Sequence, residues 1–338
     1  MSEERSSPQH LIGLADLGRD ALHDVLDLAQ RLKGRPNRGE LAGRSAGMLF
    51  FRGSLRTRAS FEAAINQLGG QAINLTAMSD FWDLEEREGT VMDGRAPEHV
   101  KDAAVVLSRY VDVLAIRPAP AGHSWDVDRQ DREIQTWARH ATVPVINMES
   151  AQRHPLQALA DLMTMREHLG SLPGKRLAVT WVHSPEPASV GVVHSLLYAS
   201  LLEGMTVHLA HPPGYEIDGE ILKQVEEVAT ENGGSLETGH SLEDAVEGAQ
   251  IVYARSWQSL EDYGNKTLSA SHRARLRDWK IDEKLMELGD DMRLMHAMPI
   301  RRNVEVNDAI LDGTQSLIYE QAENRLHSQK ALLLKLLR

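Results

Sequence analysis

Short apolar segments alternate with longer amphipathic ones along most of the chain, and this alternation constrains the fold more than any other feature of the sequence. In the first half it predicts strands at 46–51, 71–75, 111–116 and 143–146 and helices at 14–32, 98–110, 131–140 and 155–169. In the second half it predicts strands at 176–182, 206–210, 251–254, 293–296 and 316–319 and helices at 189–202, 219–232, 242–247, 307–311 and 322–337. Nearly continuous apolar strands joined by helices indicate parallel sheets covered on both faces. The sequence therefore predicts an α/β fold with two parallel-sheet domains.

The length of 338 residues exceeds what one compact core usually holds, which also favours two domains. We expect a first domain at 1–154, a second at 155–320, and a C-terminal helix at 321–338 that packs back on the first domain. Ligands of open α/β sheets bind at the carboxyl ends of the strands. Because polar residues follow strands in both halves, we expect the active site in the cleft between the two domains.

Composition excludes several classes of function. The net charge is −12 without a block of basic residues, which argues against nucleic acid as a partner. The absence of cysteine excludes disulfides, thiolate metal sites and a thiol nucleophile. No apolar stretch is long enough to cross a membrane, and residues 1–10 are polar. We expect a soluble, cytoplasmic protein with no membrane partner.

A polar turn follows the strand at 46–51 and opens a helix. Ser54, Arg56 and Thr57 offer two hydroxyls and a guanidinium, and Leu55 contributes a backbone N–H. The free N–H groups and positive dipole of a helix start bind anions, and arginine suits phosphate oxygens. The turn is therefore a candidate phosphate site. On spacing alone, a serine helix cap with solvated arginines is the more common explanation.

Further polar residues come at other strand ends. Arg117 ends one predicted strand, and His154 and Gln157 flank the start of a helix with Pro155 in its first turn. A loop rich in arginine, 296–303, follows another strand. Taken singly, each has an ordinary structural explanation: a cap, an ion pair or a basic loop.

Taken together, these motifs resemble the aspartate/ornithine carbamoyltransferase family. The family's carbamoyl phosphate signature, Ser-x-Arg-Thr-Arg, is present at 54–58, and its His-Pro-x-Gln motif at 154–157 is followed by ALADLMT. The resemblance extends from about residue 10 to the C-terminus. Finer features are similar to the N-acylornithine branch: the loop from Phe81 and Trp82 to Gly94, the segments 147–149 and 253–257, and the motifs at 301–303 and 323–325. The turn at 183–187 resembles the one through which that branch forms a trefoil knot.

The resemblance implies the roles of the candidate residues. The N-acylornithine branch binds carbamoyl phosphate in the first domain and acylornithine in the second, without a cofactor or metal. Members of this branch transfer the carbamoyl group to the δ-amine of the acylornithine in arginine biosynthesis. The implied catalytic residues are Thr57, Arg117, His154 and Gln157. Carbamoyl phosphate binding is implied for Ser54, Leu55, Arg56, Thr57, Arg117, His154, Gln157, Met298 and Pro299. Acylornithine binding is implied for Trp82, Pro97, Glu149, Arg255, Lys266, Ala297, Met298 and Arg302. Trp82 is expected to serve a neighbouring subunit, so a homotrimer with shared active sites is implied.

This chain departs from the branch at several positions. It has Ala297-Met298 where the branch has Cys-Leu, Arg255 where the branch has lysine, and Glu305 where acetyl-specific members have lysine. Pro97 aligns with proline in succinyl-type members and glutamate in acetyl-type members. A carboxylate there would repel a succinyl carboxylate. The sequence thus favours N-succinylornithine over N-acetylornithine as the acceptor.

Two other classes of function remain as alternatives. The strand–helix pattern of the second half also fits a nucleotide-dependent oxidoreductase, but the turn after the strand at 176–182 lacks the glycine-rich fingerprint of dinucleotide sites. A paralogue that uses another amine, or that binds carbamoyl phosphate or another anion without transferring the group, is the second alternative.

Overall fold

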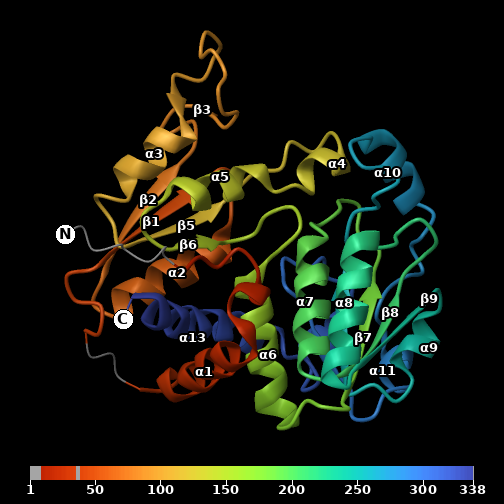
Figure 1. The fold of residues 1–338 in the computed structure, drawn as a ribbon. Coiled ribbons are helices and arrows are strands. Elements are labelled where there is room, and N and C mark those ends of the chain that lie inside the picture. Colours follow the sequence, from red (N-terminus) through yellow and green to blue (C-terminus); the bar gives the residue numbers. More distant parts are fainter. Residues whose placement is uncertain (1–8, 36–38, 338) are drawn as a thin grey trace. The chain divides into compact units, whose positions relative to one another are not determined.

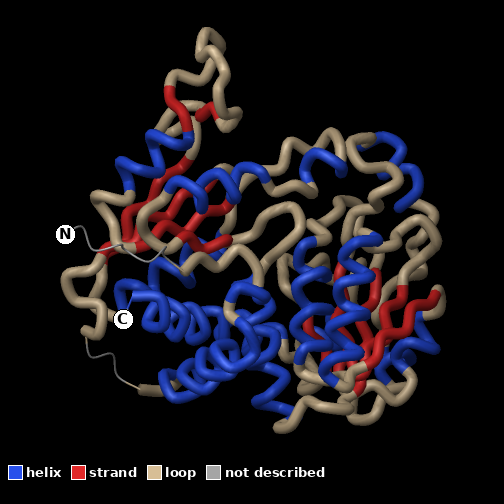
Figure 2. The backbone as a smooth tube through the Cα atoms, viewed as in Figure 1, coloured by secondary structure: helices blue, strands red, loops and turns tan. Residues whose placement is uncertain are grey.

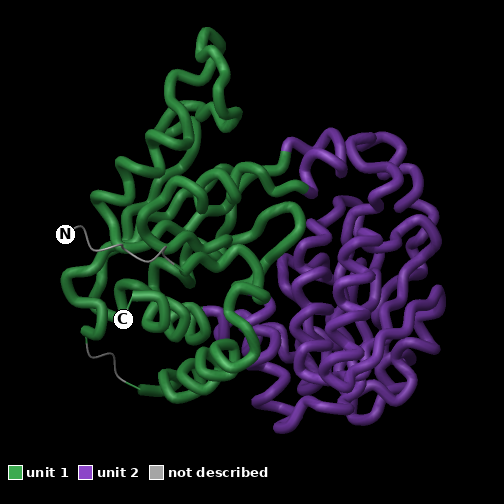
Figure 3. Tube along the Cα trace, in the orientation of Figure 1, with its two compact units in different colours: residues 1–120, 130–156, 326–338 green, residues 121–129, 157–325 purple. Residues whose placement is uncertain are grey.

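The computed structural model describes residues 9–35 and 39–337, which form two compact units (Figure 3). Unit 1 comprises the described parts of 1–120, 130–156 and 326–338, and unit 2 comprises 121–129 and 157–325. The expected boundary at 154/155 thus lies at 156/157, and the C-terminal segment joins unit 1 from Leu326 rather than from residue 321. The segment 121–129, expected in the first domain, belongs to unit 2.

Unit 1 is built on a parallel sheet in the order β2-β1-β5-β6 (Figure 1). Its strands are Ser45–Phe50 (β1), Gln71–Thr76 (β2), Val113–Arg117 (β5) and Val145–Asn147 (β6). Helix α2, Leu55–Gln67, connects β1 to β2. The chain then crosses back over β1 to β5, and right-handed crossovers in opposite directions place helices on opposite faces. Helices α3, Val100–Leu107, and α5, Arg132–His140, accordingly pack together in a core that contains Leu49, Ile116 and Trp137.

Unit 1 also contains helices from the two ends of the chain. Residues Leu14–Asp16 form a short 3-10 helix (η1), Gly18–Leu32 form α1, and Ile318–Leu337 form α13. The last two helices are linked by an ion pair between Asp24 and Lys335, 2.9 Å apart. A small parallel pair, Leu84–Glu85 (β3) with Glu98–His99 (β4), projects from the unit. In Figure 1 this pair lies beyond α3.

Unit 2 is built on a five-stranded parallel sheet in the order β11-β10-β7-β8-β9. Its strands are Arg176–Trp181 (β7), Thr206–Ala210 (β8), Ser235–Gly239 (β9), Ile251–Arg255 (β10) and Arg293–Met295 (β11). Helices Gly191–Leu202 (α7) and Gly219–Asn232 (α8) lie side by side over one face (Figure 1). The other face packs against Leu242–Val246 (α9) and Glu283–Met286 (α11). Figure 2 shows the strands of each sheet flanked by helices, as an α/β fold requires.

The remaining helices of unit 2 are Trp125–Asp128 (α4), Pro155–Leu169 (α6, which begins in unit 1), Lys266–Arg273 (α10) and Asp308–Leu311 (α12). The expected strand at 316–319 is wrong. Ser316 makes only an isolated bridge to Leu294, and helix α13 already begins at Ile318. The helix expected from residue 98 begins at Val100, because Glu98 and His99 pair with β3 instead. Among the residues described, no helix has the length and apolar character needed to cross a bilayer.

Segment 121–129 belongs to unit 2 because its polar side chains bond there. The indole Nε1 of Trp125 donates to Asp218 over 2.6 Å. The buried carboxylate of Asp128 accepts the N–H groups of Ala121 and Gly122 and the hydroxyl of Tyr263. The bonds to Asp218 and Tyr263 join residues far apart in sequence, so local patterns could not reveal them.

Replacing Gly264 by alanine tests this packing. A Cβ at Gly264 would lie 2.4 Å from the carbonyl oxygen of His123, and the residue has φ +85°. We expect a loss of roughly 2–4 kcal/mol of unfolding free energy for Gly264→Ala. The matched control is Gly233→Ala, which has a similar φ of +74° in open space and should lose about 1 kcal/mol. Thermal unfolding midpoints measure both, and equal losses would contradict this packing.

Candidate functional site

The predicted anion turn has the geometry of a capped helix start. Ser54 is the N-cap of α2, and its hydroxyl oxygen accepts the N–H of Thr57 at 3.3 Å. The N–H groups of Leu55 and Arg56, the first two helical residues, have no acceptor within the helix. The arrangement therefore keeps donors at a positive helix end, as an anion site requires.

Arg58, the last residue of this motif, has a different role. Its Nη2 donates to the hydroxyl of Thr76 at 2.8 Å, and its guanidinium lies 4.2 Å from the ring centroid of Phe50. Arg58 therefore fastens α2 to the sheet.

The register of the sheet brings the other unit 1 candidates to the same edge. Phe50 pairs with Arg117, and Ile116 pairs with Asn147, so β1, β5 and β6 end side by side. The turn at Ser54, the side chain of Arg117 and the segment after Asn147 all follow these ends. Parallel strands thus gather residues from three distant parts of the sequence, as the strand-end rule predicts.

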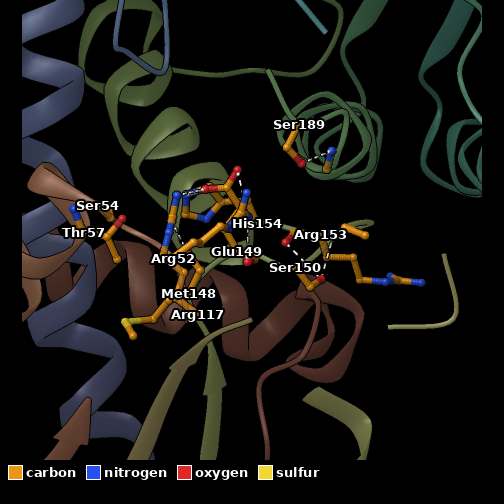
Figure 4. A network of polar contacts seen from close by, with 12 residues as sticks. Arg52, Ser54, Thr57, Arg117, Met148, Glu149, Ser150, Arg153, His154 and Ser189 are labelled. Atoms are coloured by element: carbon orange, nitrogen blue, oxygen red, sulfur yellow. Dashed lines mark hydrogen bonds and ion pairs between the residues drawn. The ribbon is translucent and has the colours of Figure 1, made fainter. Parts of the chain in front are cut away.

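Glu149 forms the centre of this cluster (Figure 4). Its Oε2 lies 2.5 Å from Nη2 of Arg117 and 3.8 Å from Nε2 of His154. Its Oε1 lies 3.5 Å from Nη2 of Arg52, which also donates to the main-chain oxygen of Glu149 at 3.1 Å. Glu149, Arg117 and His154 are buried. The carboxylate expected to bind the acceptor therefore contacts two residues expected to bind carbamoyl phosphate.

The backbone of Glu149 is held in an unfavourable conformation. Its φ is +144°, a region that favours glycine. The N–H of Glu149 donates to the side chain of Asn147 at 3.0 Å, and the amide of Asn147 donates to the carbonyl of Ile12 at 2.9 Å. Strained residues persist where the surroundings over-determine them, often at functional sites.

Asp131 holds the loop that follows Glu149 through two hydrogen bonds. It accepts the hydroxyl of Ser150 at 2.6 Å and the N–H of Ala151 at 3.0 Å. Burial raises the pKa of Asp131 to about 6, although these hydrogen bonds favour its ionised form. The loop between Asn147 and His154 is therefore fixed by side chains on both sides.

Unit 2 holds the remaining candidates for carbamoyl phosphate. Gln157, in the first turn of α6, is buried; its Nε2 donates to Asp161 at 2.8 Å and its Oε1 accepts from Arg325 at 3.3 Å. His296 follows β11, and its Nδ1 accepts the N–H of Met298 at 2.8 Å.

Glu305, expected as a departure from the family pattern, is the partner of His296. Because Nδ1 of His296 is an acceptor, its Nε2 carries the proton and donates to Glu305 over 2.8 Å. Burial opposes the ionisation of Glu305, but hydrogen bonds from His296 and Ser184 outweigh it and hold its pKa below the usual value. Glu305 is buried and satisfied.

The acceptor candidates of unit 1 come together through the small sheet. Leu84 pairs with Glu98, so the segments that carry Trp82 and Pro97 enter this pair at the same end. Trp82 is 72% exposed. It borders a cavity of about 360 Å³ that Glu133 also lines. Burial raises the pKa of Glu133 to about 8, so its carboxyl is mostly protonated at neutral pH.

The acceptor candidates of unit 2 differ in burial and in the residues that they contact. Arg255 ends β10 and is buried, whereas Lys266 begins α10 and is exposed. Arg302 forms ion pairs with Asp308 and Asp312, at 2.8 and 2.7 Å, which raise its pKa. An acceptor carboxylate at Arg302 would compete with these two partners.

The sequence predictions missed Arg52, Asp161 and Glu133. Arg52 lies two residues beyond the end of β1, so its place near a strand end was a usable signal. Asp161 lies one helical turn beyond Gln157, a spacing that puts both on one face. Nothing local distinguishes Glu133. Within the described ranges, no group of three or more histidine or acidic side chains is arranged to hold a metal ion.

Replacing Glu149 by glutamine tests the cluster. The substitution leaves Arg117 buried without its ionic partner, so we expect Glu149→Gln to lower the thermal midpoint, with a loss of up to about 3–5 kcal/mol. The same change removes a negative charge that repels an anion, so inorganic phosphate should bind about 3–10 times more tightly. Calorimetry and thermal unfolding measure both effects. Glu231→Gln, on the exposed side of α8, should change neither, and a variant of Glu149 that behaves like it would refute the cluster's role.

Both halves of the chain are similar to known protein domains. Residues 9–167 match the family described as "Aspartate/ornithine carbamoyltransferase, carbamoyl-P binding domain", and 179–336 match its "Asp/Orn binding domain". The chain is 38% identical to the N-acetylornithine carbamoyltransferase of Xanthomonas campestris pv. campestris, over 97% of both chains. It is 39% identical to an ornithine carbamoyltransferase of a Parafrankia species, over 96% of this chain and 95% of that one.

Among solved structures, the chain is similar to an N-acetyl-L-ornithine transcarbamylase mutant, with a glutamate replaced by proline, complexed with carbamyl phosphate and N-succinyl-L-norvaline. The TM-score is 0.94 at 38% identity, covering 97% of this chain and 99% of the other. The two family domains match the two halves of the chain in order. The chain belongs to the aspartate/ornithine carbamoyltransferase family.

Proposed function

We propose that this protein transfers the carbamoyl group of carbamoyl phosphate to the δ-amine of an N-acylornithine in arginine biosynthesis. The products are N-acylcitrulline and phosphate. The observation that carries the proposal is the meeting of the Ser54 turn, Arg117 and His154 at one edge of the unit 1 sheet, in a member of the carbamoyltransferase family.

The phosphate end of the donor matches the groups of unit 1. The capped turn supplies backbone N–H groups and the side chains of Ser54, Arg56 and Thr57. Arg117 adds a second guanidinium, already charge-balanced by Glu149. Guanidinium groups and helix-start N–H groups bind phosphate oxygens strongly and stabilise charge on the leaving group.

The carbamoyl end needs two kinds of partner. Its carbonyl oxygen gains negative charge when the amine attacks, and His154, Thr57 and Arg117 are the donors we assign to it. Its NH₂ group needs acceptors, which we assign to the oxygen of Gln157 and the main-chain carbonyls of Met298 and Pro299. The attacking amine must lose a proton, and the departing phosphate is a base that can take it. The reaction then needs no covalent intermediate, and orientation of the two substrates supplies much of the rate.

The acceptor is the less constrained part of the proposal. The chain is 38% identical to an N-acetylornithine carbamoyltransferase and 39% identical to an ornithine carbamoyltransferase, so percentage identity does not distinguish the two acceptors. The exposed Trp82, on the segment that pairs with the one carrying Pro97, supports an acylated acceptor, because an aromatic side chain can cover an acyl group. Pro97 in place of a carboxylate supports N-succinyl over N-acetyl substrates. The related transcarbamylase with proline in place of glutamate was complexed with an N-succinyl ligand.

A side-by-side assay tests the function. We expect carbamoylation of N-succinylornithine to exceed that of N-acetylornithine, with little turnover of ornithine, when each is supplied with carbamoyl phosphate. Product formation is measured colorimetrically as the ureido group. Turnover of ornithine alone would establish the function suggested by the Parafrankia relative, and turnover of none would refute transfer to all three.

Replacing Pro97 by glutamate tests the acyl preference. The new carboxylate should repel a succinyl group, so Pro97→Glu should lower the ratio of kcat/KM for the succinyl over the acetyl substrate by about tenfold. Pro97→Ala is the control, because it removes the ring without adding charge. A ratio that changes equally in both variants would show that the backbone of the turn, and not charge, determines the preference.

We also propose a homotrimer in the cytoplasm, with Trp82 serving a neighbouring subunit and a trefoil knot near the turn at 183–187. Mixed subunits test the shared site. Trp82→Ala and Arg56→Ala should each be nearly inactive alone. Refolded together in equal amounts, they should recover roughly a quarter of wild-type activity, because about a quarter of the sites then combine intact residues. Absence of recovery in trimers confirmed by ultracentrifugation would place both residues in one subunit's site.

A further inference from the structure

A buried polar network in unit 2 connects two of the groups assigned above to the carbamoyl NH₂ group. Its centre is Asp161, which accepts three hydrogen bonds. Nε2 of Gln157 donates to its Oδ1 at 2.8 Å, Nε2 of Gln321 to the same oxygen at 2.7 Å, and the hydroxyl of Tyr253 to its Oδ2 at 3.1 Å. These side chains are at most 2% exposed.

The network fixes which end of the Gln157 amide is oxygen. One end faces the carboxylate of Asp161, which only accepts when ionised, and the other faces the guanidinium of Arg325, which only donates. A flipped amide would place its NH₂ against a guanidinium and its oxygen against a carboxylate. Burial raises the pKa of Asp161 to about 6, so the group remains mostly ionised at neutral pH. The oxygen of Gln157 is therefore presented as an acceptor.

The same carboxylate reaches the second set of acceptors. Gln321, held by Asp161, accepts the backbone N–H of His296 through its Oε1 at 2.8 Å. His296 in turn accepts the N–H of Met298. The loop that carries the Met298 and Pro299 carbonyls is thus anchored at its start by the network that orients Gln157.

We propose that Asp161 is a positioning residue for recognition of the carbamoyl NH₂ group. Its carboxylate fixes the amide of Gln157 directly and the loop that begins at His296 through Gln321. This inference rests on the proposed function. Its specific consequence is discrimination between carbamoyl phosphate and acetyl phosphate, which has nearly the same shape but carries a methyl group in place of NH₂.

The physical reason is that a site selects a ligand with an NH₂ group when its acceptors are oriented before the ligand binds. A site built to accept an N–H rejects an analogue that lacks it, because buried acceptors are then left unpaired. If the amide of Gln157 can flip, or the loop can shift, the site loses that preference while its anion turn still binds the phosphate end.

The test measures the binding of carbamoyl phosphate, acetyl phosphate and inorganic phosphate by calorimetry, without an acceptor. The wild type should prefer carbamoyl over acetyl phosphate by about tenfold or more. Asp161→Leu and Gln321→Met should each reduce this preference to about threefold or less, with inorganic phosphate affinity changed by less than about twofold. Asp161→Asn, which keeps one acceptor oxygen, should give an intermediate preference.

The matched control is Thr164→Val. Thr164 is equally buried on the same helix; it donates to Ala160 and accepts from Asn324, two bonds that do not involve the Asp161 network. Its variant should keep the wild-type preference despite a comparable loss of buried hydrogen bonds.

The outcomes separate the two proposals. A wild type that does not prefer carbamoyl phosphate contradicts the proposed donor and, with it, this inference. A wild-type preference that survives in Gln321→Met and in whichever Asp161 variants fold overturns the inference alone. An equal weakening of all three ligands would also overturn it, because it shows a general structural role.

Discussion

The buried pair of Arg117 and Glu149 is the interaction on which the site in unit 1 depends. Neither charge could lie in this environment alone, because an unpaired buried ion costs several kcal/mol. Paired at 2.5 Å, they keep the guanidinium of Arg117 at the end of β5. The candidate anion turn at Ser54 itself contains no acidic residue in its first helical turn. The strained backbone of Glu149 is the cost of aiming its carboxylate at Arg117 and His154 together.

The features that sequence could predict are local ones. Apolar runs located most strands, and Ser54 located the start of α2, because each depends on residues within a few positions. Glu149 was expected to bind the acceptor. Its pairing with Arg117 could not be predicted, because it depends on the register of β5 and β6. The contact of Asp161 with Gln321 and the bonds of segment 121–129 to unit 2 are equally non-local. The false strand at 316–319 arose because four apolar or β-prone residues cannot be distinguished from a helix start by period.

The structure explains one departure from the family pattern, Glu305, better than another, Ala297. Glu305 adds a carboxylate near the predicted acceptor residues, which by charge alone would oppose a succinyl group. It is buried, however, and its charge is stabilised by hydrogen bonds from His296 and Ser184 and by the nearby positive charge of Arg255. Glu305 therefore supports the loop, and it gives no reason against a succinylated acceptor. Nothing in the structure explains Ala297 beyond its small, buried side chain.

In each unit a buried carboxylate orients polar side chains: hydrogen-bond donors in unit 1 and a hydrogen-bond acceptor in unit 2. In unit 1 Glu149 holds Arg117 and His154, which are donors; in unit 2 Asp161 holds Gln157 with its oxygen available as an acceptor. Carbamoyl phosphate has the complementary division, with acceptor oxygens on its phosphate and carbonyl and a donor NH₂ group. A sequence motif identifies candidate side chains, but carboxylates outside the motif set the direction of those side chains. In unit 1 this carboxylate is Glu149, and in unit 2 the direction of the Gln157 amide depends on Asp161.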